Sequence, residues 1–197
     1  MRFAPTSFRP AFGRVLAVVM CVLASAGIVG FIVTGDLVGL ARYGWGLALL
    51  AAIALALYWF PSLDVVEHEV TVRNVFSTVH VPWPTIERVD TKYALTIYTA
   101  SGKVTAWASP APNRYATQAA NSSDARLAAQ ASGTNPRPGD LPGTVSGAAA
   151  LVIRSHWEDL REAGHLGEAL PITRDVHWVT IAVLGGLLVA TVLGIVL

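Results

Sequence analysis

Long apolar stretches alternate with polar ones along the chain, and three of them are long enough to cross a membrane. Residues 15–34 contain no charged side chain and have the length of about 20 residues that a transmembrane helix needs. Residues 43–60 form a second uncharged stretch with aromatic residues at both ends, which suit the two membrane interfaces. The third stretch covers residues 177–197. The pattern therefore predicts three transmembrane helices.

Between the second and third spans the pattern changes to strict alternation. Residues 70–73 and 95–98 alternate apolar with polar side chains, which is typical of half-buried strands. Residues 100–103 carry a hairpin turn signal, Ala-Ser-Gly-Lys. We expect about five short antiparallel strands over residues 64–108, enough for a curled sheet with one apolar face.

Two further segments follow the predicted strands. Residues 109–147 are rich in Ala, Ser, Pro, Gly and Asn and have few large apolar side chains, so they predict a disordered insertion. Residues 148–164 predict one amphipathic helix, because Ile153, Trp157 and Leu160 form an apolar stripe at helical spacing. The stripe is expected to pack on the open face or end of the sheet; a membrane surface is the alternative.

Capping and charge signals refine this predicted helix. Ser146 is the expected cap at its start and Gly164 the expected end. Arg154 and Glu158 lie four residues apart on the polar side and are expected to pair. Because this side mixes both signs of charge, it disfavours a helix lying on lipid, which would be rich in Lys and Arg.

Composition agrees with a membrane protein and excludes several other classes. Hydrophobic residues make up 53% of the chain and charged residues 14%, whereas soluble domains carry about 25% charged residues. The net charge of +1 argues against a nucleic-acid partner. Cys21 is the single cysteine, so neither an intrachain disulfide nor a cysteine-based zinc site can form.

The distribution of arginines predicts the orientation. Arg2, Arg9 and Arg14 precede the first span, whereas the short loop before the second span contains only Arg42. The positive-inside rule therefore predicts that residues 1–14 and the segment between the second and third spans are cytoplasmic. Cleavage of a signal peptide near Ala24-Ser25-Ala26 is the alternative, but the apolar stretch continues beyond an ordinary signal-peptide core.

Small residues recur at helical spacing within the spans and suggest close helix packing. Such ladders let helices approach one another in lipid, within one bundle or against another membrane subunit, although Ala- and Gly-rich membrane sequence alone gives the same pattern. No Asp, Glu, Lys or Arg lies inside a span, which argues against a transporter. The predicted packing residues are Gly44, Ala48, Ala52, Gly186, Ala190 and Gly194.

The segment VTVRNVFSTVHVPWPTIERVD, followed by LTIYTASGKVTAWA, resembles a bacterial pleckstrin-homology (PH)-like domain. Such domains occur in small actinobacterial membrane proteins of the low-molecular-weight protein antigen 6 family. The resemblance implies an α+β membrane protein of the bacterial cell membrane, with a small antiparallel PH-like β-barrel or sheet closed by an amphipathic helix. It brings no catalytic residues. The residues that carry it are Arg73, Asn74, Pro82, Trp83 and Ile86.

The sequence contains no pattern that indicates catalysis or a cofactor. The five histidines form neither an HxH nor an HExxH motif, and no phosphate-binding loop or nucleophile elbow is present. We therefore expect no enzymatic activity, no cofactor and no metal. Trp83 and Trp107 are expected to be core or rim residues of the predicted sheet.

Two functional hypotheses remain. The first is a non-enzymatic scaffold or accessory subunit that contacts the lipid bilayer and another membrane protein. The second is a sensor of anionic lipid headgroups, because each basic side chain near an anionic surface adds about 1 kcal/mol; dispersed, solvated charge is the simpler interpretation of the same residues. The candidate lipid contacts are Arg73, Arg88, Lys92 and Lys103.

Overall fold

The computed structural model describes residues 5–110, 140–141 and 143–196 and divides the chain into two compact units. Unit 1 comprises the chain up to Arg9 and Ser62–Asp175. Unit 2 comprises Pro10–Pro61 and the chain from Val176 onward. Most of the predicted insertion, residues 111–139, lies outside the described residues.

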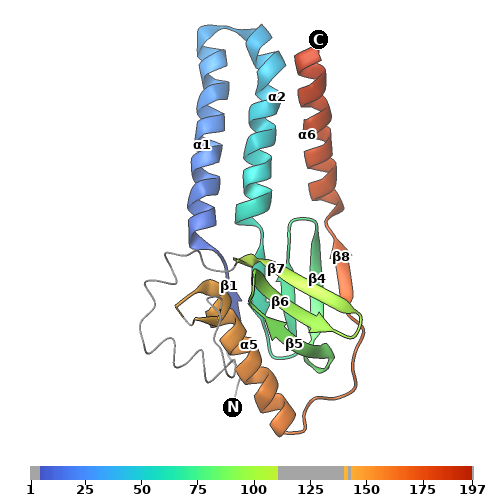
Figure 1. Ribbon diagram of the computed structural model, residues 1–197. Helices are drawn as coiled ribbons and strands as arrows, with labels where there is room; N and C mark the ends of the chain where they lie inside the picture. The colour runs from blue at the N-terminus through green and yellow to red at the C-terminus, as the bar shows by residue number, and fades with distance from the viewer. Residues whose placement is uncertain (1–4, 111–139, 142, 197) are drawn as a thin grey trace. The chain divides into compact units, whose positions relative to one another are not determined.

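Unit 2 consists of three apolar helices (Figure 1). Helix α1 spans Ala11–Thr34, α2 spans Leu37–Ala54 and continues as the π-helical turn η1 (Leu55–Trp59), and α6 spans Trp178–Val196. Within the described residues, these three helices are long and apolar enough to cross a membrane. Their length and composition are consistent with a membrane protein.

Helix α2 begins six residues before the predicted span. Gly35 adopts a left-handed conformation (φ 73°), which ends α1 and turns the chain. The Asp36 carboxylate then accepts a hydrogen bond of 2.7 Å from the Gly39 amide and caps α2. Residues 37–42, expected in a loop, therefore form the first turns of the helix.

Glycines set the packing of α2 against its two neighbours, but they are only partly the predicted ones. A Cβ atom on Gly194 of α6 would lie 2.8 Å from the carbonyl oxygen of Ala41, so this glycine permits close approach to α2, as predicted. A Cβ atom on Gly27 of α1 would lie 2.8 Å from a methyl group of Leu47 in α2, a contact with a flexible side chain, and Gly27 was not among the predicted packing residues. Gly186 has no atom within 4 Å of such a position and does not contribute.

The other predicted packing residues make looser contacts. Gly44 is buried, yet its nearest neighbour is Leu40 of the same helix. Gly46, two positions later, is the glycine that faces Thr191 of α6, at 3.5 Å from its methyl group. Ala48, Ala52 and Ala190 are half-buried.

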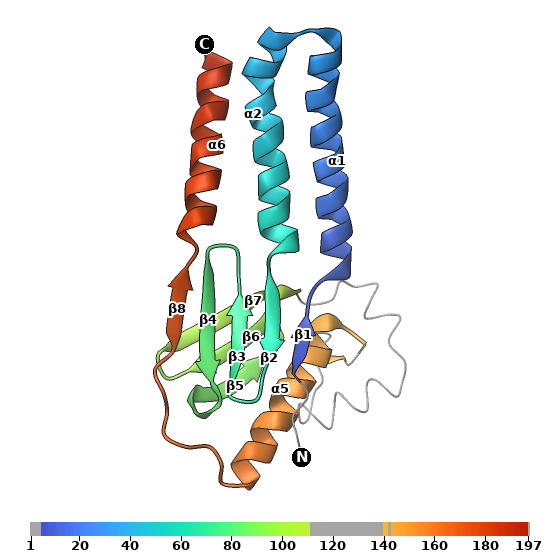
Figure 2. The same cartoon turned by 180° about the vertical axis from the view of Figure 1, so that it is seen from behind.

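Unit 1 contains two sheets (Figures 1 and 2). Sheet A has the order β1-β2-β3-β4-β8, and its strands β1 to β4 are antiparallel to their neighbours. Sheet B has the order β5-β6-β7 and is antiparallel. The strands of sheet A are Thr6–Phe8, Ser62–Val65, Glu69–Arg73, Ser77–Pro82 and Thr173–Val176. Those of sheet B are Ile86–Asp90, Ala94–Thr99 and Gly102–Pro110.

The α+β class is confirmed, but the expectation of one curled sheet or closed barrel is wrong. Strand β4 ends at Pro82, and the 3-10 turn η2 (Trp83–Thr85) carries the chain out of sheet A before β5 starts sheet B. Pro82 and Pro84 have no amide hydrogen for a ladder, which favours a break at this point. The edge strands β1 and β8 come from segments in which no strand was predicted.

The core of unit 1 lies between the two sheets and helix α5 (Val145–Glu162). Alternate residues of β2, β3, β4 and β6 are fully buried, as the alternation predicted. Helix α5 adds Ala149, Ala150 and Ile153, and Trp157 and Leu160 pack at the edge of the core. The predicted apolar stripe therefore covers the sheets.

Helix α5 begins earlier than predicted and has a different cap. The hydroxyl of Thr144, not that of Ser146, accepts the hydrogen bond from the Gly147 amide at 3.0 Å. Ser109 and Pro110 end strand β7, and Leu141 is buried. The expectation that disorder extends from 109 to 147 is therefore wrong at both ends.

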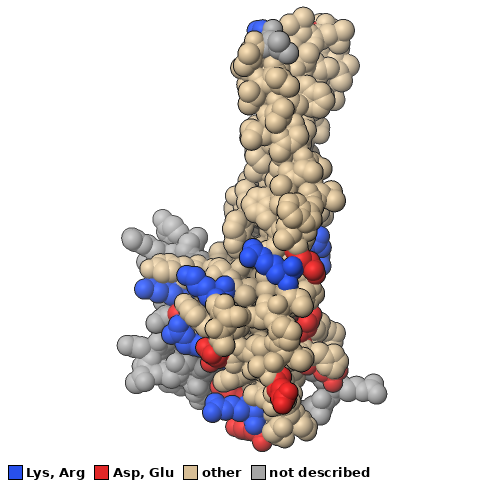
Figure 3. Space-filling model, turned by 90° about the vertical axis from the view of Figure 1, so that its right-hand side faces the viewer, with Lys and Arg blue, Asp and Glu red and all other residues tan. Residues whose placement is uncertain are grey.

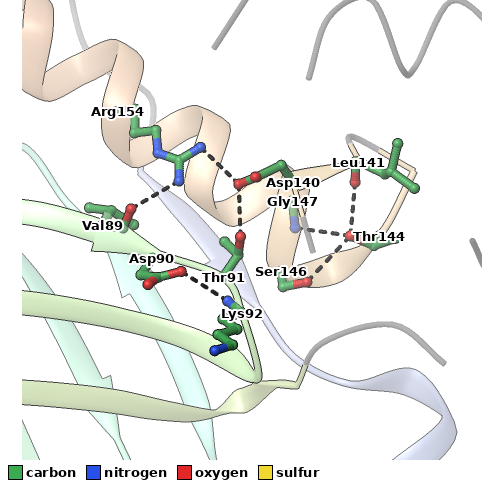
Figure 4. A network of polar contacts seen from close by, with 10 residues as sticks. All are labelled: Val89, Asp90, Thr91, Lys92, Asp140, Leu141, Thr144, Ser146, Gly147 and Arg154. Atoms are coloured by element: carbon green, nitrogen blue, oxygen red, sulfur yellow. Dashed lines mark hydrogen bonds and ion pairs between the residues drawn. The ribbon is translucent and has the colours of Figure 1, made fainter. Parts of the chain in front are cut away.

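A buried ion pair ties the start of α5 to sheet B (Figure 4). Arg154 donates from Nη1 to Oδ1 of Asp140 and from Nη2 to the carbonyl oxygen of Val89, both at 2.9 Å. The hydroxyl of Thr91 donates to the same carboxylate oxygen at 2.7 Å. The predicted pairing of Arg154 with Glu158 is not what the structure shows, because Arg154 points toward the sheet.

Replacing Arg154 with Met is expected to lower the free energy of unfolding of unit 1 by about 3 kcal/mol, because the buried Asp140 carboxylate and the Val89 carbonyl lose the hydrogen bonds that the Arg154 guanidinium donates. Arg161→Met is the matched control, since Arg161 is exposed and stacks on Trp157. Urea unfolding of the detergent-solubilised chain, followed by tryptophan fluorescence, measures both variants. Equal stability of the two variants would show that the ion pair does not hold α5 in place.

Candidate functional site

The side chain of Asn74 joins the two sheets. Asn74 follows β3 and donates a hydrogen bond of 2.8 Å from Nδ2 to the carbonyl oxygen of Thr105. Its Oδ1 accepts a hydrogen bond of 2.9 Å from the Trp107 amide. The carboxamide therefore makes the two hydrogen bonds to β7 that one residue of a neighbouring strand would make. The Arg73-Asn74 signature has a structural reason here, because only a side chain with both a donor and an acceptor can bridge these two backbone groups.

The two bonds also show which backbone groups of β7 face away from β6. Amide and carbonyl groups alternate between the two sides of a strand, so residues 103, 105 and 107 direct theirs to the side of Asn74. Val104 is paired with Ile97 of β6. Strand β7 is the edge of sheet B, and Asn74 covers only the part of this edge near Thr105 and Trp107.

A groove of about 330 Å³ follows the remaining part of the β7 edge. It lies between two edge strands, β7 of sheet B and β8 of sheet A, where the barrel is open. We call it the seam groove. Its lining residues are Asn74, Ser77, Val79, Thr99, Ser101, Gly102, Lys103, Val104, Thr105, Trp107, Ile172 and Arg174.

The seam groove is basic and rich in hydroxyl groups. Lys103 comes from the hairpin between β6 and β7, and Arg174 comes from β8. Arg174 donates from Nε to the hydroxyl of Ser77 at 3.2 Å, which holds its side chain beside β4. Among the described residues that line the groove, none is acidic. The groove can therefore accept an anionic group, with Val79, Val104 and Trp107 as apolar contacts.

The structure does not bring the four predicted basic residues together. Arg73 extends from the exposed face of sheet A, opposite the side that carries Val72. Arg88 lies over the ring of Tyr98 at 4.2 Å, and Tyr98 is paired with Lys103. Lys92 lies between β5 and β6, 5.1 Å from the ring of Tyr93. Only Lys103 therefore lines the groove.

Charge on unit 1 is mixed. Figure 3 shows Lys and Arg side chains interspersed with Asp and Glu side chains on the face turned to the viewer. A surface that attracts a membrane by charge alone would instead gather one sign. The mixed pattern favours specific contacts over a general electrostatic one.

The two predicted tryptophans have different environments. Trp83 is buried, donates from Nε1 to the carbonyl oxygen of Val66 at 3.2 Å and meets the ring of His156 edge-on at 4.8 Å. It anchors η2 to the core, as expected. Trp107 is 49% exposed, so it is available for contact beside the groove and is not a core residue. Pro82 and Ile86, on either side of η2, are buried.

The histidines do not form a metal site within the described residues. His80 lies on the outer face of sheet A and contacts Glu69 at 2.6 Å through Nδ1 and Asp175 at 3.5 Å through Nε2. His68 is exposed in the turn before β3 and does not join them. The His80 cluster links β8 to the middle of the sheet.

Sequence reasoning missed Arg174, Asp140 and β1. Arg174 is isolated in a polar linker pattern, and only the pairing of β8 beside β4 places it near Lys103. Asp140 lies in a composition typical of disorder, and its role depends on Arg154 fourteen residues later. The alternating segment Thr6–Phe8 was too short to signal a strand.

The comparison with protein families gives one match, to the model described as the bacterial PH domain, over residues 61–154. The match covers a little under half of the chain, from the start of β2 into α5. Residues 61–154, the part of unit 1 from β2 into α5, are therefore similar to a bacterial PH domain, and we call unit 1 PH-like on this basis. Neither curated proteins nor solved structures gave a match. A PH-like domain indicates a binding or scaffold module.

Asn74→Ala is expected to lower the free energy of unfolding of unit 1 by about 2 kcal/mol, because the Thr105 carbonyl and the Trp107 amide lose their partner. Asn74→Asp is the matched variant, because it keeps the acceptor for the Trp107 amide but loses the donor to the Thr105 carbonyl. Its free energy of unfolding is expected to lie between those of the wild type and of Asn74→Ala. Urea unfolding with tryptophan fluorescence measures the series. An Asn74→Ala variant as stable as the wild type would contradict the proposed bridge.

Proposed function

We propose that the protein is a non-enzymatic membrane scaffold or accessory subunit whose PH-like domain binds another protein. The observation that carries this proposal is the connection between the units. Strand β1 ends at Phe8, and α1 starts at Ala11. The turn η1 ends at Trp59, and β2 starts at Ser62. Strand β8 ends at Val176, and α6 starts at Trp178. Three connections of one or two residues therefore join the binding module to the apolar helices.

This arrangement favours protein binding over membrane targeting as the task of the domain. A domain tethered at three points does not need lipid affinity to reach the membrane. Its exposed aromatic side chains Phe76 and Trp107 belong to the residue types that dominate protein interfaces. The open seam adds two strand edges, which extended segments of partner proteins can pair with.

Binding of anionic lipid headgroups is the second candidate. The row Arg88, Tyr98 and Lys103 across neighbouring strands of sheet B favours it, because it presents two cations, one on either side of Tyr98. The separation of Arg73 and Lys92 from this row weighs against a shared lipid surface for all four. We therefore rank the binding of anionic lipid headgroups below protein binding.

We further propose that the protein lies in the bacterial cell membrane with its N-terminus and PH-like domain in the cytoplasm. Strand β1 pairs with β2, so the start of α1 and the end of η1 lead to the same sheet. This pairing supports an inserted helical hairpin with both ends on one side. The Arg73-Asn74 and Val81-Pro82-Trp83 motifs support assignment to the actinobacterial family of low-molecular-weight protein antigen 6, which is part of the same proposal.

Affinity purification from native membranes in mild detergent, after brief crosslinking, is expected to recover a stoichiometric protein partner. Trp107→Ala is expected to reduce this recovery, because it removes an exposed aromatic anchor beside the groove. Tyr93→Ala is the matched control, since Tyr93 is exposed and does not line the groove. Recovery of the chain alone, with or without crosslinking, would contradict a scaffold role.

Thiol labelling of intact cells tests the orientation. In a Cys21→Ala background, a cysteine at Ser101 in the β6–β7 turn is expected to resist a membrane-impermeant maleimide. A cysteine at Leu37, at the start of α2, is expected to react. Both positions should react after permeabilisation. The reverse pattern in intact cells would overturn the proposed orientation.

A further inference from the structure

The seam groove has the features of a site for a missing strand. Sheet A ends at β8 and sheet B ends at β7, and both edge strands line the same groove. A closed barrel would have these two edges joined. Here Asn74 bonds one end of the β7 edge, and Arg174 of β8 bonds Ser77 of β4 on the opposite wall, so neither of these bonds links β7 to β8.

Asn74 shows that the β7 edge accepts a strand-like partner. Its carboxamide bonds one carbonyl and one amide of β7 at distances of 2.8 and 2.9 Å, as a neighbouring backbone would. The outward groups of Lys103 and the amide of Thr105 continue the same edge along the groove. Since β7 is the edge strand of sheet B among the residues that the structure describes, an extended segment can extend the ladder from the point where Asn74 ends.

The basic side chains of the groove favour an extended partner segment that is acidic. Lys103 and Arg174 approach the groove from opposite walls, and the described lining residues include no Asp or Glu. Other basic side chains of unit 1 are already engaged: Arg154 with Asp140, Arg88 with Tyr98 and Arg161 with Trp157. A strand with acidic side chains would therefore find cations in the groove, and its apolar side chains would meet Val79, Val104 and Ile172.

We propose that the seam groove binds an extended, acidic segment of a partner protein, which adds to strand β7 and places its carboxylates against Lys103 and Arg174. This inference rests on the proposed function and names the site and the chemistry of the partner. The occupant is recognised partly through its backbone and partly through its charge. Trp107, at the end of the groove, adds an apolar contact.

Peptide binding to the full chain in nanodiscs of neutral phosphatidylcholine tests the proposal. The probe is an acetylated, amidated hexapeptide of alternating Val and Glu, measured by calorimetry and by hydrogen exchange over residues 102–107. We expect binding with slowed exchange in this stretch. N-methylation of alternate peptide nitrogens is expected to weaken binding about tenfold, because it removes ladder hydrogen bonds while keeping the charge.

Variants separate charge from backbone recognition. Lys103→Ala and Arg174→Ala are each expected to weaken binding of the Val–Glu peptide about fivefold, the loss expected for one exposed charge pair. Lys92→Ala is the matched control, because Lys92 is an exposed cation outside the groove, and it should bind as the wild type does. A peptide of alternating Val and Lys should not bind.

Three outcomes would overturn the proposal. Equal binding of the N-methylated and unmethylated peptides would leave charge alone as the cause. Equal losses in Lys92→Ala and Lys103→Ala would show binding without a defined site. Failure to bind the peptide, together with Lys103- and Arg174-dependent binding of inorganic phosphate or of phosphatidic acid in nanodiscs, would make the groove a phosphate site. In each case a partner recovered from native membranes would still uphold the scaffold function.

Discussion

The carboxamide of Asn74 is the contact on which the arrangement of the PH-like domain depends. Each sheet has one apolar face, and the domain is stable only if the two faces cover each other. Apolar packing provides the driving force but little direction, because it is roughly proportional to area. Two hydrogen bonds from one planar group to Thr105 and Trp107 fix where β7 crosses sheet A. They also leave the rest of the β7 edge open.

A second polar contact has a similar effect on the other side of the core. Arg154 of α5 bonds both Asp140 and the backbone at Val89, so the helix is tied to sheet B and to the chain that leads into it. Asn74 and Arg154 thus hold the sheets and the helix around one core. Because both contacts are polar and directional, they position the elements more sharply than Val and Leu packing would. In the described part of the domain, the seam groove lies between β7 and β8, the edge strands of the two sheets.

Features of the fold could be predicted from the sequence where they depend on residues that are close together in the chain. The alternation in residues 70–73 and 95–98 predicted strands whose buried and exposed sides the structure reproduces. The stripe Ile153, Trp157 and Leu160 predicted the face of α5 that meets the core. The break between strands at Pro82-Trp83-Pro84 also has a local cause, because proline limits the backbone at its own position. Each of these signals lies within a few neighbouring residues.

The sequence alone determined the apolar helices, the strand periodicity, the burial of Trp83 and the absence of recognisable catalytic motifs. Only the tertiary structure decided that the strands form two sheets, that Thr6–Phe8 and Thr173–Val176 complete one of them, and that Lys103 and Arg174 share a groove. The physical reason is distance along the chain. Local periodicity follows from backbone geometry, whereas strand order and edge exposure depend on pairings between segments up to a hundred residues apart, for which single side chains leave no pattern.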